Sequence, residues 1–371
     1  MLDPELRAWL RLGMLPGVGR RSAIRLLHAA GSVQALFEPV AGVSPPWLNE
    51  RLRPLLQTTP AGLDELCART DTWLQSGPDR HLLPLGHPHY PPALLNQADP
   101  PLLLHVEGQL ASLQHPCLLG VVGSRHATAQ GLDHARRFAA ALAAQGVGIV
   151  SGLALGVDGA AHEGALEGGG PTLAFVGTGL DRVYPARHQA LARRIASQGA
   201  LLSEYPLGTP PLAPHFPQRN RLIAALSQGT LVVEATLQSG SLITAQQALE
   251  QGREVFAIPG SIHAPQSRGC HALIKQGAKL VESAQDILEE LRPAQALLPL
   301  GATATEAAPL AVRTDTDPVL RALGHDPVGF DALQARTGMT TERLQARLLA
   351  LELEGALSRL AGGLFQRRAL G

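Results

Sequence analysis

Residues 118–151 read LLGVVGSRHATAQGLDHARRFAAALAAQGVGIVS and contain one complete strand–helix–strand unit. One short apolar run ends at Val122 and a second ends at Val150. Such runs, bounded by Gly, Ser or Pro, are typical of strands buried on both faces of a sheet. Residues 128–145, between them, follow a helical pattern. This unit predicts parallel strands joined by a right-handed crossover.

The same alternation of strand and helix continues through residues 82–292. Further candidate strands end at Val176, Ser203, Glu234 and Ile258, and helical patterns cover residues 186–197, 221–226 and 241–251. The repeats predict an α/β fold, an extended, Rossmann-like, doubly wound and mostly parallel sheet. Ligands of such sheets bind at the carboxyl ends of the strands, so the residues found there are the candidates for a site.

The region before this block, residues 1–80, is helical and rich in Leu and Arg. It contains LPGVGRRSAI at residues 15–24, a pattern typical of a helix-hairpin-helix. Backbone N–H groups near Gly17 and Gly19 would be free to bind a phosphate in such a hairpin. A turn that only packs two helices together fits the same residues equally well.

The region after the block divides into two parts. Residues 293–317 are rich in Ala, Pro, Thr and Gly and predict a linker. Residues 318–371 predict a winged helix, with a short helix at 330–336, a turn at 337–339, a longer helix at 341–354 and a two-strand wing. Arg343 and Arg347 share a face of the longer helix and can approach duplex DNA, although winged helices also bind proteins.

Composition narrows the class of protein. The 31 basic and 31 acidic side chains balance, so the chain lacks a globally basic coat for nucleic acid, and only a local basic patch remains possible. Cys67, Cys117 and Cys270 are too far apart in the sequence for a zinc site or a disulfide framework. We expect no metal, no membrane span and no signal peptide, and therefore a cytoplasmic protein.

Three polar turns follow predicted strands and form the candidate binding site. Gly123, Ser124 and Arg125 lead from the first strand into a helix, and Phe216, Arg219, Asn220 and Arg221 precede an apolar helix. Ser239, Gly240 and Ser241 open another helix. Arginines grip phosphate through bidentate hydrogen bonds, helix N-termini attract anions, and a phenyl ring can stack on a base. Together they predict a pocket for a phosphate-rich ligand.

Enzymatic signatures are incomplete along the same edge. The turns match neither the dinucleotide-binding nor the ATP-binding glycine pattern, so we expect no cofactor. Asp158, His162 and Glu234 are candidates for acid–base chemistry, but no nucleophile or metal set completes a site. The favoured interpretation is that Asp158 caps a helix, that His162 packs beneath its loop, and that the protein has no catalytic residues.

A series of ordered motifs identifies a resemblance to a known family. VGSR, SGLALGVDGAAH, FVGTGLDRVYP, LLSEYP, HFPQRNRLIAALS, VVEA, SGSLITA, VFAIPG and LIKQGAK occur in this order. The series resembles the bacterial DNA-processing protein A family, DprA, also called Smf. The resemblance implies a Rossmann-like domain that binds single-stranded DNA and forms homodimers. It also implies a helical, SAM-like N-terminal domain and a C-terminal winged helix.

The resemblance also implies a role and a set of site residues. Family members protect incoming single strands during natural transformation and help to load the RecA recombinase. By motif, the pocket for single-stranded DNA consists of Gly123, Ser124, Arg125, Phe216, Arg219, Asn220, Arg221, Ser239, Gly240 and Ser241. The family often places lysines along the DNA path, whereas this chain has only Lys275 and Lys279, so arginines such as Arg187, Arg193 or Arg194 would take their place.

Two other functions remain open from the sequence. The first is an enzyme acting on a nucleotide or nucleoside phosphate, because Rossmann-like folds often host such chemistry and fold alone does not decide function. The second is a regulator that binds duplex DNA through the winged helix.

Overall fold

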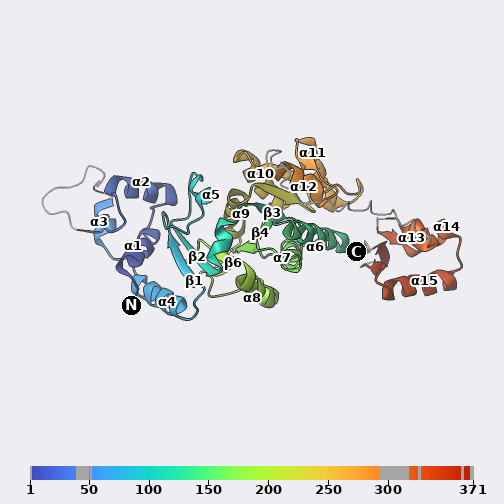
Figure 1. Cartoon of the computed structure of the whole chain (residues 1–371), viewed down its shortest axis with the longest axis horizontal. Helices are drawn as coiled ribbons and strands as arrows, with labels where there is room; N and C mark the ends of the chain where they lie inside the picture. Colours follow the sequence, from blue (N-terminus) through green and yellow to red (C-terminus); the bar gives the residue numbers. More distant parts are fainter. Residues whose placement is uncertain are drawn as a thin grey trace, which may run out of the picture.

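The computed structural model describes residues 2–38, 50, 52–291, 317–324, 327–360 and 363–367. Figure 1 shows three units along the long axis: a helical unit at the N-terminus, a central α/β unit, and a small C-terminal unit. The predicted linker at 293–317 lies outside the described residues, except for Asp317.

The central unit is built on a nine-stranded sheet in the order β1-β2-β6-β5-β4-β3-β7-β8-β9. From β6 to β9 all neighbouring strands are parallel, whereas β1 and β2 form an antiparallel edge next to β6. The strands are β1 (Arg80–Pro84), β2 (Leu103–Gly108), β3 (Leu118–Val122), β4 (Gly148–Ser151), β5 (Thr172–Phe175), β6 (Ala200–Ser203), β7 (Gly229–Val232), β8 (Glu254–Ala257) and β9 (Lys279–Leu280).

Helices cover both faces of this sheet, as expected of a doubly wound fold (Figure 1). One face is covered by α6 (Ala129–Ala144), α7 (Val157–Glu167), α8 (Gln189–Gln198) and α12 (Ala284–Leu291). The other face is covered by α5 (Pro92–Leu95), α9 (His215–Leu226), α10 (Gly240–Glu250) and α11 (Arg268–Lys275). Short 3₁₀ turns are η1 (Leu110–Gln114), η2 (Ala186–His188) and η3 (Pro265–Ser267).

Alternate side chains along the strands belong to two separate apolar cores, one on each face of the sheet. In β3, Leu119 and Val121 belong to the core beneath α6, α7 and α12, while Leu118 and Val122 belong to the core beneath α9 and α10. Successive residues of a strand point to opposite faces, so a strand covered on both sides must be apolar at every position. This is why the strands appear in the sequence as continuous apolar runs.

The order of the strands reverses between β3 and β7. From β3 the chain adds β4, β5 and β6 in one direction, and then α9 carries it back across the other face to β7, β8 and β9. At such a switch point the loops that follow the two neighbouring strands diverge, which opens a crevice for a ligand. The loops after β3 and β7 carry the sequence-predicted G-S-R and S-G-S motifs.

The N-terminal unit contains α1 (Pro4–Gly13), α2 (Arg20–Ala30), α3 (Leu52–Gln57) and α4 (Leu63–Gln75). A turn with Gly17 at φ +73° joins α1 to α2, as the predicted hairpin requires. The apolar core of this unit continues into Leu82, Leu102 and Leu103 on the antiparallel edge of the sheet. The N-terminal helices therefore pack directly on the central unit.

The C-terminal unit is a winged helix with its own core. It consists of α13 (Pro318–Leu323), β10 (Val328–Gly329), α14 (Phe330–Thr337), α15 (Thr341–Leu353), β11 (Leu357–Arg359) and β12 (Leu364–Arg367). Leu344, Leu348 and Leu351 of α15 are buried, as predicted. Arg343 is exposed, but Arg347 is held by Asp317 at 2.6 Å and by Glu354 at 3.4 Å.

Among the described residues, none of the helices has the length and apolar character needed to cross a membrane.

Candidate single-stranded DNA interface

The G-S-R turn is held firmly at the switch point. The backbone N–H of Ser124 donates to the carbonyl of Glu234, 2.8 Å away on the neighbouring loop. The carbonyl of Ser124 accepts from Val157 N–H at the start of α7, at 3.1 Å. Gly156 has φ +81°, and a Cβ there would lie 2.2 Å from the Ser124 carbonyl oxygen. Glycine at this position therefore allows the two loops to meet.

This turn places Arg125 in solvent beside an aromatic pair. The Arg125 guanidinium carbon lies 5.2 Å from the centre of the Phe216 ring, and that ring lies 5.6 Å from the ring of Tyr184. Arg125 is exposed and Tyr184 is 47% exposed. We call these three residues the arginine–aromatic patch. It offers a cation for a phosphate and flat surfaces for bases.

A glycine also makes room for the aromatic pair. A Cβ added to Gly177, in the loop after β5, would lie 3.2 Å from the Phe216 ring. The ring thus lies directly over backbone that follows β5. Gly177 is therefore needed for close packing against the Phe216 ring, whatever other glycines in the strand-end turns contribute to ligand binding.

The position of the R-N-R segment differs from the prediction. Helix α9 begins at His215, so Arg219, Asn220 and Arg221 lie within its second turn and not at its N-terminus. Asn220 therefore does not cap the helix, and its side-chain oxygen accepts a hydrogen bond from Arg219 Nε at 3.1 Å. The anion-attracting end of a helix is not available to these residues.

Arg219 is buried and is engaged with backbone. Its side chain is among the buried polar groups, with 3% of the residue exposed. Nη1 donates to the carbonyl of Gly152, at 2.6 Å, and to the carbonyl of Phe175. These carbonyls follow β4 and belong to the end of β5, so Arg219 ties two strand ends together. In this arrangement Arg219 is not free to grip phosphate, and its assignment to the DNA pocket stays a prediction.

The charge of Arg219 is retained despite its burial. Burial lowers the pKa of Arg219 to about 10, which still leaves the guanidinium charged at neutral pH. The Asp158 carboxylate supplies the main opposing effect, because its negative charge favours the charged guanidinium. Burial raises the pKa of Asp158, and the nearby Arg219 charge lowers it. Each group thus stabilises the other in a buried environment.

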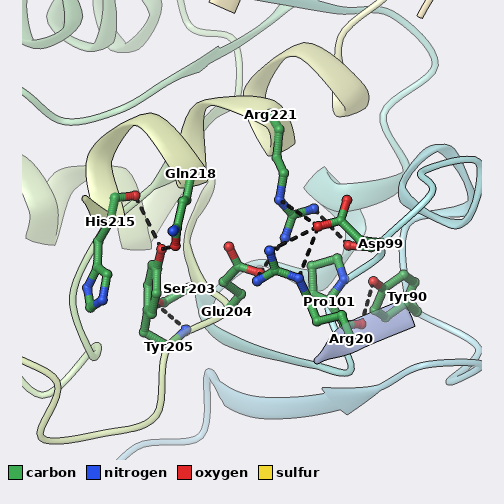
Figure 2. Close-up of polar contacts among 10 residues, drawn as sticks. All are labelled: Arg20, Tyr90, Asp99, Pro101, Ser203, Glu204, Tyr205, His215, Gln218 and Arg221. Carbon is green, nitrogen blue, oxygen red and sulfur yellow. Dashed lines mark hydrogen bonds and ion pairs between the residues drawn. The ribbon is translucent and has the colours of Figure 1, made fainter. Parts of the chain in front are cut away.

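Arg221 belongs to a cluster of four charged side chains (Figure 2). It contacts Glu204 through Nη2 and donates from Nη1 to the carbonyl of Asp99 at 3.0 Å. Arg20, at the start of α2, lies 2.9 Å from both Glu204 and the Asp99 carboxylate. Arg221 is therefore occupied in joining the N-terminal unit to the sheet, and its assignment to the DNA pocket stays a prediction.

The S-G-S turn opens a helix, as predicted. Ser239 is the N-cap of α10, and its Oγ accepts from Ser241 N–H at 3.4 Å and contacts Ser241 Oγ at 2.7 Å. Gly240 is exposed, whereas Ser241 is only 6% exposed. The turn follows β7, next to the β3 strand that leads to Arg125, so both lie along one edge of the sheet.

The acid–base candidates have structural roles. His162 is fully buried: Nδ1 contacts Thr172 Oγ1 at 2.7 Å, and Nε2 accepts from Leu153 N–H at 3.3 Å. Burial lowers the pKa of His162 to about 3, so the ring is neutral near pH 7. Glu234 accepts from the N–H and hydroxyl of Thr128, at 2.9 and 2.6 Å, and so holds the start of α6.

Within the described part of the chain, no group of three or more His, Cys, Asp or Glu side chains is arranged so that it could hold a metal ion. Cys270 is fully buried, with Sγ 3.6 Å from the Val232 carbonyl. The adjacent His271 contacts the carbonyl of Gly260 at 3.0 Å.

Comparison with known proteins agrees with this architecture. Residues 81–292 match the model of the DNA recombination-mediator protein A family, and residues 303–363 match that of the DprA winged helix domain. The chain belongs to the DNA recombination-mediator protein A family. Protein Smf of Escherichia coli (strain K12) is 40% identical over 99% of this chain and 97% of its own length.

Two solved structures of DprA proteins are also similar to this chain. That of DprA from Streptococcus pneumoniae has a TM-score of 0.63 and 36% identity, covering 79% of this chain and 99% of its own. That of DprA from Helicobacter pylori, described as showing a single-stranded DNA binding mode, has a TM-score of 0.53 and 32% identity. It covers 57% of this chain and 95% of its own. The fold predicted from the DprA motifs is thereby confirmed.

Two residues of this region were absent from the predicted site. Tyr184 extends the aromatic surface of Phe216, and Glu204 holds Arg221 away from solvent. The sequence shows both residues in strand-end turns, in VYP and SEYP. Nothing in those turns indicates which ring or which charge each one meets, because their partners lie more than ten residues away in the chain.

Proposed function

We propose that this DprA-family chain binds single-stranded DNA at the carboxyl edge of its parallel sheet and acts as a recombination mediator without catalysis. The observation that carries the proposal is the arginine–aromatic patch: an exposed Arg125 beside Phe216 and Tyr184. Arg125 would hold a phosphate, the two rings would stack on bases, and the N-terminus of α10 at Ser239 would hold a further phosphate.

The patch favours a single strand over a duplex for physical reasons. Bases in a single strand can turn outward and stack on a ring, whereas duplex bases are already stacked and paired. Phosphate contacts and stacking also carry no sequence preference. A chain with zero net charge binds through such a local patch, so its affinity should fall as salt rises.

The buried arginines support the site indirectly in this proposal. Arg219 joins the ends of β4 and β5, and Arg221 anchors α9 through Glu204. Both stabilise the helix whose first turn carries Phe216. They are positioning residues for that ring.

Family membership supports a proposal for the wider role. We propose that the protein works in the cytoplasm as a homodimer, protects incoming single strands during natural transformation, and delivers them to the RecA recombinase. The winged helix would add contact with duplex DNA through the exposed Arg343. Absence of catalysis fits the structural roles of His162 and Glu234, and a screen for nucleotide turnover tests it directly.

The test is fluorescence anisotropy with labelled single-stranded and duplex oligonucleotides of equal length, over a range of salt. Wild type should prefer the single strand. Arg125→Ala should weaken binding of the single strand. It should also make the slope of log affinity against log salt shallower by about 0.7, the contribution of one phosphate contact to a single strand. Arg182→Ala is a matched control, because Arg182 is exposed but paired with Asp181. Equal binding of both DNA forms, or an unaffected Arg125→Ala, would refute the proposal.

A further inference from the structure

The first turn of α9, which carries Phe216, lies outside the apolar cores. His215 and Phe216 are only partly buried, and the buried part of the helix begins at Arg219. The turn contacts Tyr205, whose ring stacks on the His215 ring with centroids 4.1 Å apart. The Tyr205 hydroxyl also donates to the His215 carbonyl at 3.2 Å (Figure 2). The position of the Phe216 ring therefore depends on where Tyr205 lies.

Tyr205 directly follows Glu204, a buried carboxylate in the loop after β6. The Glu204 side chain is 4% exposed, and its Oε2 contacts Arg221 of α9 and lies 2.9 Å from Nη1 of Arg20. A buried carboxylate is costly unless its charge is paired and hydrogen-bonded. The two arginines thus hold this loop in place. The loop in turn holds α9 at two points, through Arg221 and through the contact of Tyr205 with the first turn.

Arg20 is the member of this charged cluster that comes from the N-terminal unit (Figure 2). Its Nη2 lies 2.9 Å from the Asp99 carboxylate, which Arg221 Nε approaches at 3.8 Å. Burial raises the pKa of Glu204, and the charges of Arg221 and Arg20 lower it. Without Arg20, two carboxylates would share one arginine, so the loop and Arg221 would have to rearrange.

We propose, on the basis of the single-stranded DNA function, that Arg20 is a positioning residue for the arginine–aromatic patch. Through Glu204 it fixes the loop after β6, and through Tyr205 and Arg221 that loop fixes the start of α9. The N-terminal unit thereby controls the order of the Phe216 ring without touching the DNA. Any event that separates α2 from the sheet would loosen the patch.

Three substitutions isolate the role of the Arg20 charge. Arg20→Gln removes the charge and keeps a polar side chain, whereas Arg20→Lys keeps the charge and should rescue. Arg21→Gln is the matched control, because Arg21 is the next residue of α2, is exposed and lies outside the cluster. It changes the net charge by the same amount. Urea unfolding establishes that all three variants are folded.

The first measurement is hydrogen–deuterium exchange of the full chain without DNA. Arg20→Gln should speed exchange in peptides that cover residues 215–221, because local opening is easier where a helix end has lost its support. Exchange in α6 should stay as in wild type. Arg20→Lys and Arg21→Gln should leave the start of α9 unchanged.

The second measurement is anisotropy with a labelled single strand over a range of salt. Arg20→Gln should weaken binding by about two- to thirtyfold, the range expected of residues that act through others, and by no more than Phe216→Ala does. Its salt slope should stay as in wild type, since no phosphate contact is lost. Combined with Phe216→Ala it should add little, because the two substitutions affect the same ring.

Several outcomes would overturn the proposal: unchanged exchange at residues 215–221 in Arg20→Gln, full additivity with Phe216→Ala, or an equal loss of affinity in Arg21→Gln. A shallower salt slope in Arg20→Gln would mean that Arg20 contacts phosphate itself, which also overturns it. Failure of the single-stranded DNA function is a different result, namely a wild type that does not prefer the single strand. The exchange measurement would still show whether Arg20 orders the start of α9.

Discussion

At the scale of single residues, two arginines at the same edge of the sheet have different environments. Arg125 and Arg219 are both arginines at the carboxyl edge of the sheet, yet one is exposed and the other 3% exposed. Burial makes Arg219 a bridge between strand ends, whereas the side chain of Arg125 is exposed to solvent. We therefore expect substitution of Arg219 to lower stability and substitution of Arg125 to leave stability unchanged.

Arg219→Ala should act mainly on stability. It would remove the donors of the Gly152 and Phe175 carbonyls and leave the buried Asp158 without its main positive neighbour. Hydrogen bonds from a charged group contribute about 1.5–3 kcal/mol each, so the free energy of unfolding should fall by on the order of 3 kcal/mol or more. Urea denaturation measures this loss, with Arg125→Ala as the surface control. A fully stable Arg219→Ala that binds DNA poorly would instead restore a direct phosphate role.

Phe216→Ala should weaken single-stranded DNA binding through lost stacking. A base stacked on an aromatic ring contributes about 1–3 kcal/mol. No charge is lost, so the salt dependence should stay as in wild type, unlike that of Arg125→Ala. Anisotropy at several salt concentrations separates the two effects. A reduced salt slope in Phe216→Ala would mean that the ring acts only by positioning Arg125.

At the scale of elements, each helix start or strand end determines which groups reach the ligand. Helix α9 begins at His215 and not at the predicted residue 221, and this moves R-N-R from the helix entrance into the second turn of the helix. Pro214 and Pro217 flank the start of α9, and proline is tolerated in a first turn, so the sequence does permit this earlier start.

Deletion of residues 318–371 should leave most of the single-stranded DNA affinity intact. The winged helix has a separate apolar core, formed by α13, α14, α15 and its own strands, and the arginine–aromatic patch contains none of its residues. Anisotropy on the truncated chain, with circular dichroism to verify folding, measures the effect. Loss of binding by a folded truncation would move the site to the winged helix.

At the scale of the whole molecule, acid should destabilise the fold through its buried histidines. Burial lowers the pKa of His162 to about 3 and that of His105 to about 4. Below about pH 6.5 the unfolded chain binds protons that the folded chain does not, so the free energy of unfolding falls by up to about 1.4 kcal/mol per pH unit for each histidine.

Two buried carboxyls oppose this trend. Burial raises the pKa values of Asp158 and Glu204, and their folded forms therefore take up protons before the unfolded forms do. Urea denaturation between about pH 7 and about pH 5 measures the net slope. His105→Phe should make the slope shallower, because one of the two histidines no longer titrates. An unchanged slope would show that His105 is protonated in the folded state.

The sequence by itself determined the class of fold and the family. Continuous apolar strands alternating with helices specify a parallel sheet covered on both faces, because a strand between two layers has no polar side. The family motifs and the spacing of the leucines in the winged helix can also be recognised from short stretches of sequence. Arg125 and Phe216 were both predicted as site residues in this way, because each belongs to a short motif next to a strand or helix.

Only the tertiary structure decided which polar groups are free. Arg219 and Arg221 meet partners from other strands and loops, so no local pattern shows that their donors are already used. Tyr184 joins Phe216 across more than thirty residues. The cluster of charged side chains around Glu204 forms only where the N-terminal helices pack on the sheet. Burial and pairing depend on residues that are distant in the chain, and so they follow from the packed fold alone.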